Sequence, residues 1–231
     1  MKGYSITLIF LFSCCTASLF AQGKAKSIQL DKGQVLDVLL LNDAGNDAAK
    51  QRYFKEAFPV AQKHGYQPGA GWAVKEVPFQ GNQHPELFVT GSWPSVAART
   101  AGLSALEKEV DDFHGQRRTV WTNFQITYFE LPQAVSITTD PTKYYVATMF
   151  WSAAVKPFKQ FLEKWEKQQK QHGGTPLLTL TEGTSPFGYH HNPDYLTITE
   201  WPDEATFRDF LEKDRAADHT GVRHLSQFRI N

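Results

Sequence analysis

The residues best suited to chemistry gather near the C-terminal end of the sequence, where aromatic side chains precede a histidine. Trp201, Phe207 and Phe210 are followed by His219, and a basic residue, Arg223, comes four positions later. A neutral imidazole can ligate iron or act as a general base near neutral pH. Aromatic side chains commonly line small-molecule pockets. These residues predict an aromatic pocket beside Trp201, with His219 as the candidate catalytic residue and all five as candidate cofactor-binding residues.

The same residues also suit structural roles. Trp201 stands where a predicted strand turns into a helix, so its ring could close one end of the core. If the following helix ran on unbroken, Asp214 would share the apolar stripe of Phe207 and Phe210, and a buried unpaired carboxylate is costly. The helix is therefore expected to bend or end near Asp214. Periodicity leaves open whether His219 faces solvent or a ligand.

A second Trp-Pro pair, Trp93-Pro94, precedes Trp201-Pro202 by 108 residues, and this spacing recurs along the chain. It aligns His64 with His172, Gly65 with Gly173, Pro68 with Pro176, Pro85 with Pro193, and Leu103 with Leu211. Near the end the spacing falls to 104, where Phe124 meets Phe228. Such a long run without a gap predicts a tandem duplication.

The first copy keeps only part of the candidate site. Its counterparts of Trp201, His219 and Arg223 are expected to be Trp93, His114 and Arg118, and Arg99 stands in place of the aromatic Phe207. The two copies are therefore predicted to be unequal. If there is one site rather than two, it is expected in the second copy.

Each copy shows the same order of elements. A β-rich strand (35–42 and 144–151) precedes an amphipathic helix that stops at His-Gly, and Pro59 predicts a kink or break in the first of these helices. A hairpin-like strand pair follows, then a helix capped by Ser95 or Asp203, then a last strand. This β-α-β-β-α-β order is ferredoxin-like.

A four-stranded sheet with helices on one face must bury its other face. We therefore expect an α+β fold in which the two ferredoxin-like repeats pack sheet to sheet, as a pseudo-dimer resembling a dimeric α+β barrel. The predicted segments are a first repeat at 28–131, a linker at 132–142 and a second repeat at 143–231. The sequence leaves open whether the repeats pair within one chain or between the chains of a homodimer.

The composition argues against several classes of partner. Lys and Arg together number 24, as do Asp and Glu, so no basic field attracts nucleic acid. Beyond Ala21 no apolar run approaches the ~20 residues that a spanning helix needs. No metal site is predicted, because the adjacent His190 and His191 would point to opposite faces of a strand.

The N-terminal segment is typical of exported proteins. Lys2 precedes an apolar run and then small residues, which predicts a signal peptide at 1–21 with cleavage after Ala21. Export to the periplasm or the medium follows from this prediction. The alternative is a lipoprotein anchored at Cys14, because Leu11 to Cys14 loosely matches a lipoprotein cleavage box. Both cysteines, Cys14 and Cys15, lie in this segment.

The stretch LTITEWPDEATFRDFLEKDRAADHTGVR, which begins at Leu196, resembles the antibiotic-biosynthesis-monooxygenase superfamily of dimeric α+β barrels. It looks most like the haem-degrading monooxygenases of that superfamily. The resemblance implies haem as a cofactor, His219 as the proximal iron ligand and Phe210 as a wall of the haem site. Those enzymes also use a first-strand Asn in catalysis, and the matching stretch TMFWS has none. This difference favours binding over catalysis.

Two functional hypotheses follow. The first is an exported protein that binds a small aromatic or apolar molecule in a pocket beside Trp201, as a degenerate monooxygenase-like domain. The second is an active haem-binding or cofactor-independent monooxygenase that uses His219. Fold alone does not decide between them, because such folds host many chemistries, so enzyme status stays open.

Overall fold

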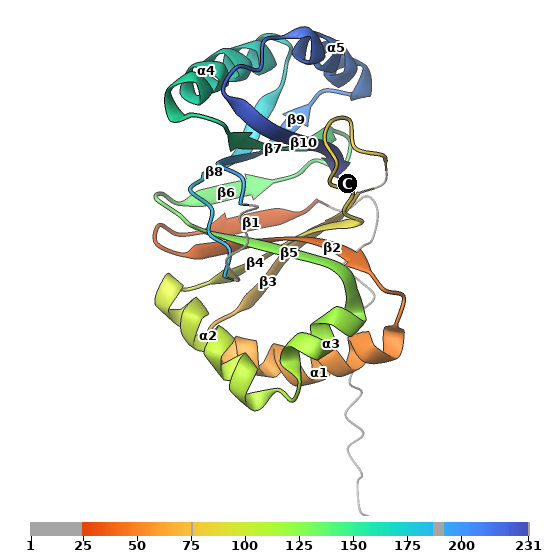
Figure 1. The fold of residues 1–231 in the computed structure, drawn as a ribbon, viewed down its shortest axis with the longest axis vertical. Coiled ribbons are helices and arrows are strands. Elements are labelled where there is room, and N and C mark those ends of the chain that lie inside the picture. Colours follow the sequence, from red (N-terminus) through yellow and green to blue (C-terminus); the bar gives the residue numbers. More distant parts are fainter. Residues whose placement is uncertain (1–24, 75, 187–191, 231) are drawn as a thin grey trace, which may run out of the picture.

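The computed structural model describes residues 25–74, 76–186 and 192–230, and it stacks two four-stranded antiparallel sheets face to face (Figure 1). The predicted signal peptide at 1–21, Cys14, Cys15, His190 and His191 lie outside the described residues. The elements, in chain order, are β1 (Ser27–Leu30), β2 (Val35–Asp43), α1 (Asp47–Lys63), β3 (Gln67–Ala73), β4 (Leu87–Trp93), α2 (Val96–Glu109), α3 (Phe113–Val120), β5 (Trp121–Glu130), β6 (Val135–Thr138), β7 (Tyr144–Ser152), α4 (Val155–Gln171), β8 (Thr175–Thr181), β9 (Tyr195–Trp201), α5 (Glu204–Ala216) and β10 (Val222–Ile230).

The two sheets have matching topology. The first has strand order β3-β4-β2-β5 and the second β8-β9-β7-β10, read in the same direction. Helices α1, α2 and α3 cover the outer face of the first sheet, and α4 and α5 cover the outer face of the second (Figure 1). The predicted α+β fold of two ferredoxin-like units packed sheet to sheet is therefore confirmed. Tandem duplication as the origin of these units stays a prediction.

Local signals in the sequence match the helix ends. Ser95 and Asp203 cap α2 and α5 by accepting hydrogen bonds from Ala98 N (3.1 Å) and Thr206 N (2.8 Å). Helices α1 and α4 both end at a histidine followed by a glycine with positive φ, as expected. A kink or break was expected near Pro59, and the structure shows no break, because α1 continues through this residue. Pro59 and Lys55 are exposed, so water can bond the Lys55 carbonyl that loses its helical donor.

The first half contains a helix that the sequence reasoning missed. Helix α3 lies between α2 and β5, whereas the second half runs from α5 through a short turn into β10. His114 and Arg118 lie in α3, so they are not the counterparts of His219 and Arg223. Strand pairing makes Trp121, opposite Asp43, the counterpart of Val222, opposite Ser152. Strand pairing identifies counterparts better than matching residue types here, because the inserted helix changes the spacing between the two repeats.

The first strands also differ by one residue from the 108-residue spacing. Val35 pairs with Trp93, and Tyr144 pairs with Trp201. Tyr144, rather than Lys143, is therefore the counterpart of Val35. By the same register, Asp37 corresponds to Val146 and Leu39 to Thr148.

The largest apolar core lies between the two sheets. Trp72, Phe88 and Phe129 of the first half pack there with Met149 and Phe228 of the second, and each of these side chains is at most 2% exposed. The segment predicted as a linker, 132–142, contains β6, which pairs with β1. This two-stranded sheet lies beside the interface (Figure 1) and contributes Ile28 and Ile137 to the same core. The two halves therefore pair within one chain.

Loops exchanged between the halves reinforce this pairing. The loop after β3 reaches the second half, where Gln80 O accepts from Gln227 N at 3.0 Å. The corresponding loop of the second half reaches back, and Thr184 exchanges two backbone hydrogen bonds of 2.9 Å with Tyr128. Gly81 permits the first loop its close approach, because its φ is +84° and a Cβ there would strike the Leu225 carbonyl oxygen. None of the helices in the described residues is long and apolar enough to cross a membrane.

Candidate functional site

The predicted pocket beside Trp201 is filled by the protein's own aromatic side chains. The Trp201 ring centroid lies 4.8 Å from that of Phe210 and 5.4 Å from that of Phe207. The Trp165 ring of α4 also packs on Phe210, with the ring centroids 5.9 Å apart. Phe207 and Phe210 have no exposed surface, and Trp201 is 1% exposed. The prediction of an open aromatic pocket here is therefore wrong, because close packing leaves no room for a ligand.

His219 lies in the turn after α5 and contacts a buried carboxylate. Its Nδ1 is 3.0 Å from Ala217 O, and its Nε2 is 3.5 Å from Asp214 Oδ1. Asp214 is 1% exposed and accepts a hydrogen bond from Gln80 Nε2 at 2.8 Å. Burial raises the pKa of Asp214, while Gln80 and His219 oppose the rise. Helix α5 thus ends near Asp214, as expected, and His219 faces that carboxylate and the Phe161 ring.

This arrangement does not fit a haem at His219. One ring nitrogen faces a backbone carbonyl oxygen and the other faces Asp214, so neither points into open space. Phe210, which the resemblance implies as a wall of a haem site, packs instead between protein rings, with Trp165 and Trp201 as neighbours. The residue set implied by the resemblance is present in sequence, but here it forms a packed core.

A haemin titration tests this conclusion. We expect micromolar haemin to produce no Soret band that depends on His219, because the imidazole has no open coordination position. The absorbance spectra of wild type, His219→Ala and the control His172→Ala should therefore coincide. A wild-type Soret band that is lost in His219→Ala alone would show that the second half opens and that His219 binds the iron.

Arg223 does not join His219. It is an exposed residue near the start of β10, and it lines a cavity at the edge of the two sheets together with Trp151 and His224. In the first half, His114 is half-exposed and lies 3.0 Å from Glu107 Oε1, and Arg118 is exposed. The structure thus brings together Trp201, Phe207 and Phe210 as core, and leaves the predicted basic residues elsewhere.

Trp93 belongs to a buried polar cluster that the sequence reasoning missed. Its Nε1 donates to Asp37 Oδ2 at 2.8 Å, and Arg99 Nε donates to Asp37 Oδ1 at 2.6 Å. Asp37 is 3% exposed and Arg99 6%. Burial raises the pKa of Asp37, and the Arg99 guanidinium opposes the rise. The sequence contained a signal for it, because Arg99 aligns with Phe207, which lies on the apolar stripe of the corresponding helix, and a buried arginine requires an acidic partner.

The first half has less aromatic side-chain volume than the second half at matching positions. At the 108-residue spacing, Ala57 stands in place of Trp165 and Gly102 in place of Phe210. Trp93 reaches the Gly102 backbone and takes up part of this space. Other side chains on the helix-facing side of the first sheet are more exposed to solvent than their counterparts in the second sheet.

Matched strand positions show the difference most clearly. Leu39 pairs with Val89 in the first sheet, and both side chains are half-buried. Their counterparts Thr148 and Thr197, which pair with each other, are 1% and 0% exposed. Larger side chains thus retain contact with solvent in the first half, while smaller ones are sealed in the second. We name the space between the first sheet and α1–α3 the first-half layer.

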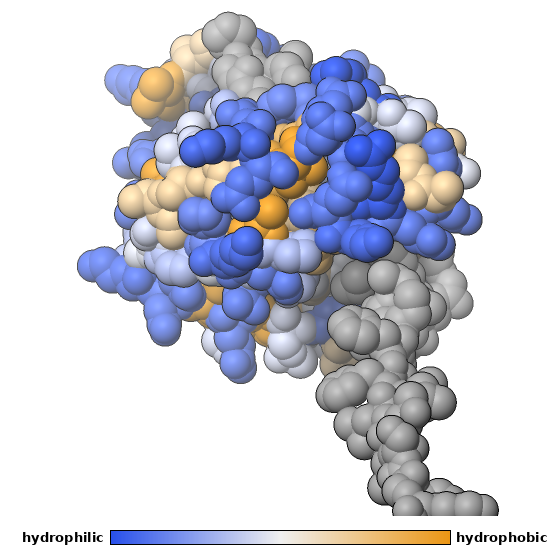
Figure 2. Space-filling model, turned by 90° about the horizontal axis from the view of Figure 1, so that it is seen from below, coloured by the Kyte–Doolittle hydropathy of each residue, from blue (hydrophilic) through white to orange (hydrophobic). Residues whose placement is uncertain are grey.

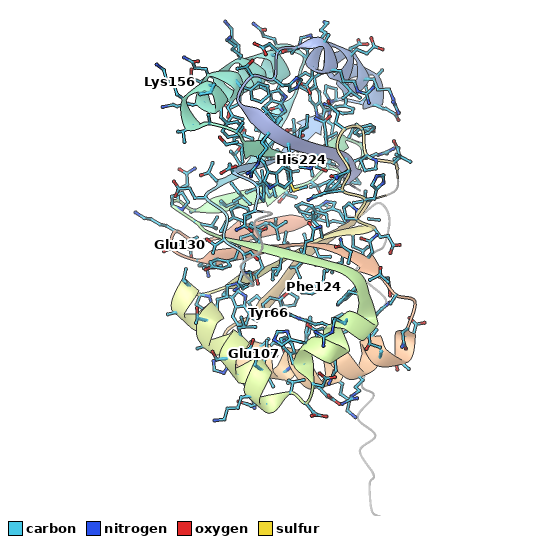
Figure 3. The ribbon with its side chains drawn as sticks, in the orientation of Figure 1. Tyr66, Glu107, Phe124, Glu130, Lys156 and His224 are labelled. Carbon is cyan, nitrogen blue, oxygen red and sulfur yellow. The ribbon has the colours of Figure 1, made fainter. Side chains whose placement is uncertain are left out.

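Aromatic rings and guanidinium groups line the first-half layer. Tyr66 and Phe124 lie between the sheet and the helices (Figure 3), and both are half-buried. The Arg117 guanidinium lies 4.3 Å from the ring centroids of both Phe113 and Phe124. Burial raises the pKa of Tyr66, so its hydroxyl group stays neutral. Such surfaces bind aromatic rings by stacking and cation–π contact.

The outer surface of this half agrees with an incompletely closed layer. Figure 2 views the face that carries α1, α2 and α3, and apolar side chains are visible there between hydrophilic ones. The apolar residues that pack at the edge of this core while keeping part of their surface exposed are Leu39, Ala49, Phe54, Tyr66, Leu87, Val89, Val96, Leu103, Phe124 and Tyr128. Among the described residues, those that pack in this way on the corresponding core of the second half are Phe79, Leu162, Val222 and Leu225.

Comparisons with known proteins place the fold. No family model matches the sequence, and no curated protein matches it significantly. A solved mutant chlorite dismutase from Candidatus Nitrospira defluvii is similar over 87% of this chain and 93% of its own, with a TM-score of 0.50 and 8% identity. A solved anthrone oxidase-like protein is similar over 89% of this chain and 94% of its own, with a TM-score of 0.48 and 11% identity. At such identity the likeness shows the fold alone: the chain shares the α+β barrel architecture of chlorite dismutase.

Proposed function

We propose that this chain is an exported, small-molecule-binding α+β barrel protein that holds an aromatic or apolar ligand in its first-half layer. The observation that carries the proposal is the half-buried pair Leu39 and Val89, whose smaller counterparts Thr148 and Thr197 are sealed. Covering apolar side chains that water still reaches is favourable, at about 25 cal/mol per Å². Export rests on the N-terminal segment at 1–21.

The lining favours a ring-bearing ligand. Tyr66 and Phe124 offer ring faces, and the guanidinium group of Arg117 lies over Phe124. A flat aromatic molecule placed among them gains stacking and cation–π attraction in addition to the burial of apolar area. Arg99 is paired with Asp37, so this buried charge needs no anionic group on the ligand.

Binding, rather than catalysis, is the role that these residues support. Asp37 accepts hydrogen bonds from Trp93 at one carboxylate oxygen and from Arg99 at the other, so both oxygens are already engaged within the protein. His219, the residue on which the alternative monooxygenase reading depends, faces a packed core. The proposal therefore retains the small-molecule partner expected from the sequence and moves it from the second half to the first.

The same substitution at two matched positions tests whether the first-half layer is open. We expect Val89→Phe to be tolerated, because the larger ring can enter the layer, and to abolish binding of an apolar fluorescent dye. We expect Thr197→Phe to lower the free energy of unfolding by about 1–3 kcal/mol, because that site is already full. Urea unfolding and dye titration measure the two effects.

Thr197→Val serves as the reference for the second site, since Thr197 Oγ1 also donates to Leu178 O at 2.8 Å and any substitution removes this bond. The relevant quantity is the difference between Thr197→Phe and Thr197→Val. Equal destabilisation at both matched positions would show that the first-half layer is closed. Undiminished dye binding by Val89→Phe would place the ligand elsewhere.

A further inference from the structure

A cavity lies at the edge of the interface between the two sheets, outside both helix-covered layers. Its volume is about 790 Å³, within the size range of small-molecule sites. Sheet residues Asn42 and Asn123 line it from the first half, and Trp151 and His224 from the second. These are corresponding strand pairs, because Asn42 is opposite Asn123 and Trp151 is opposite His224. We name this space the edge cavity.

The walls of the edge cavity are held in place by hydrogen bonds. Asn42 Nδ2 donates to His84 O at 2.9 Å, and Asn123 Nδ2 donates to Asn42 Oδ1 at 3.2 Å. Gln83 Nε2 donates to Gln125 Oε1 at 3.3 Å. Gln83 and His84 belong to the loop that crosses to the second half next to Gly81, so docking of the halves completes the cavity.

The side chains that line the edge cavity are neutral or cationic. Amide side chains, two imidazoles and the guanidinium of Arg223 face the cavity, and no aspartate or glutamate of the described residues lines it. Within the described part of the chain, no carboxylate lies within ion-pair distance of Arg223. The chain as a whole has no net charge, so this is a local excess of cationic and neutral donors. Such a lining favours an anion.

One acceptor in the wall also lacks a donor. Gln83 Oε1 is buried and has no hydrogen-bond partner among the described residues. A buried acceptor left unpaired costs about 1–3 kcal/mol. Gln83 lines the cavity, but this oxygen has almost no accessible surface, so a ligand hydroxyl group would recover that cost once the amide turns toward the cavity. We propose that the edge cavity binds a small hydroxylated carboxylate of sugar-acid size, with Arg223 contacting the carboxylate and Gln83 accepting from a hydroxyl. This site is independent of the first-half layer and of its aromatic ligand.

Isothermal titration calorimetry with three probes tests the proposal. Gluconate carries both features, sorbitol lacks the carboxylate, and hexanoate lacks the hydroxyl groups. We expect gluconate to bind, and sorbitol and hexanoate each to bind at least about tenfold more weakly. Arg223→Gln should weaken gluconate binding about tenfold or more, because a charge-assisted hydrogen bond is lost.

Matched variants separate this result from general effects. Lys167→Gln removes the same charge from an exposed position on α4 and should leave gluconate binding unchanged. Gln83→Leu provides a second, uncharged disruption and should also weaken it, while Val89→Phe should not. Absence of gluconate binding at millimolar concentration, equal binding of sorbitol, or wild-type affinity in Arg223→Gln would each overturn the proposal.

Discussion

Arg99→Met is expected to lower the free energy of unfolding by about 3–5 kcal/mol, because it leaves the buried Asp37 carboxylate without its cation. Arg99 Nε lies 2.6 Å from Asp37 Oδ1, and both side chains are nearly inaccessible to water. Trp93 supplies the one further side-chain donor that the described residues give Asp37. Urea unfolding at neutral pH measures the loss, with exposed Arg118→Met as the control for removing a positive charge.

The loss should shrink as the pH falls. Burial raises the pKa of Asp37 in the folded state, and removal of Arg99 takes away the largest opposing influence. A folded-state pKa above the unfolded value means that the ionised carboxylate opposes folding, at any pH above that folded-state value. This penalty disappears once the pH lies below the unfolded pKa. Wild type and Arg99→Met should therefore differ less in stability near pH 4 than near pH 8.

The second half contains the apolar version of this pair. Val146 corresponds to Asp37 and Phe207 to Arg99, and both are buried. The double variant Asp37→Val with Arg99→Phe should therefore recover most of the stability that Arg99→Met loses, since apolar residues often replace a buried ion pair without cost. Comparable destabilisation of the single and double variants would show that the polar cluster is required for the first half to fold.

Phe210→Ala is expected to lower the free energy of unfolding by about 3–5 kcal/mol, because it opens a cavity in the aromatic core of the second half. Phe210 has no exposed surface and contacts Trp165 and Trp201. The first half carries Gly102 at this position. The variant should therefore also acquire dye binding in the second half, as the first-half layer is proposed to have.

Phe54→Ala is the control for this prediction. Phe54 is a half-buried phenylalanine of α1, so its removal should cost clearly less. Urea unfolding gives the stability of both variants, and dye titration of Phe210→Ala in the Val89→Phe background isolates the second half. A loss below about 1 kcal/mol in Phe210→Ala would mean that the surrounding rings collapse into the space.

Much of the fold could be predicted because it depends on local signals. The caps at Ser95 and Asp203 act through hydrogen bonds within a few residues, so sequence spacing specifies them. The β-α-β-β-α-β order follows from hydrophobic periodicity in the same way. Helix α3 was missed because it lies where the spacing between the two repeats changes. Matching His114 to His219 by residue type concealed the inserted residues.

The candidate site could be predicted only in part. The sequence by itself determined which helix positions correspond at the 108-residue spacing, and so contained the exchange of Trp165 for Ala57 and of Phe210 for Gly102. Only the tertiary structure decided that the aromatic cluster beside Trp201 is sealed and that Leu39 and Val89 stay half-exposed. The physical reason is that open volume depends on the separation and packing of elements distant in sequence. Residue types alone do not specify that separation.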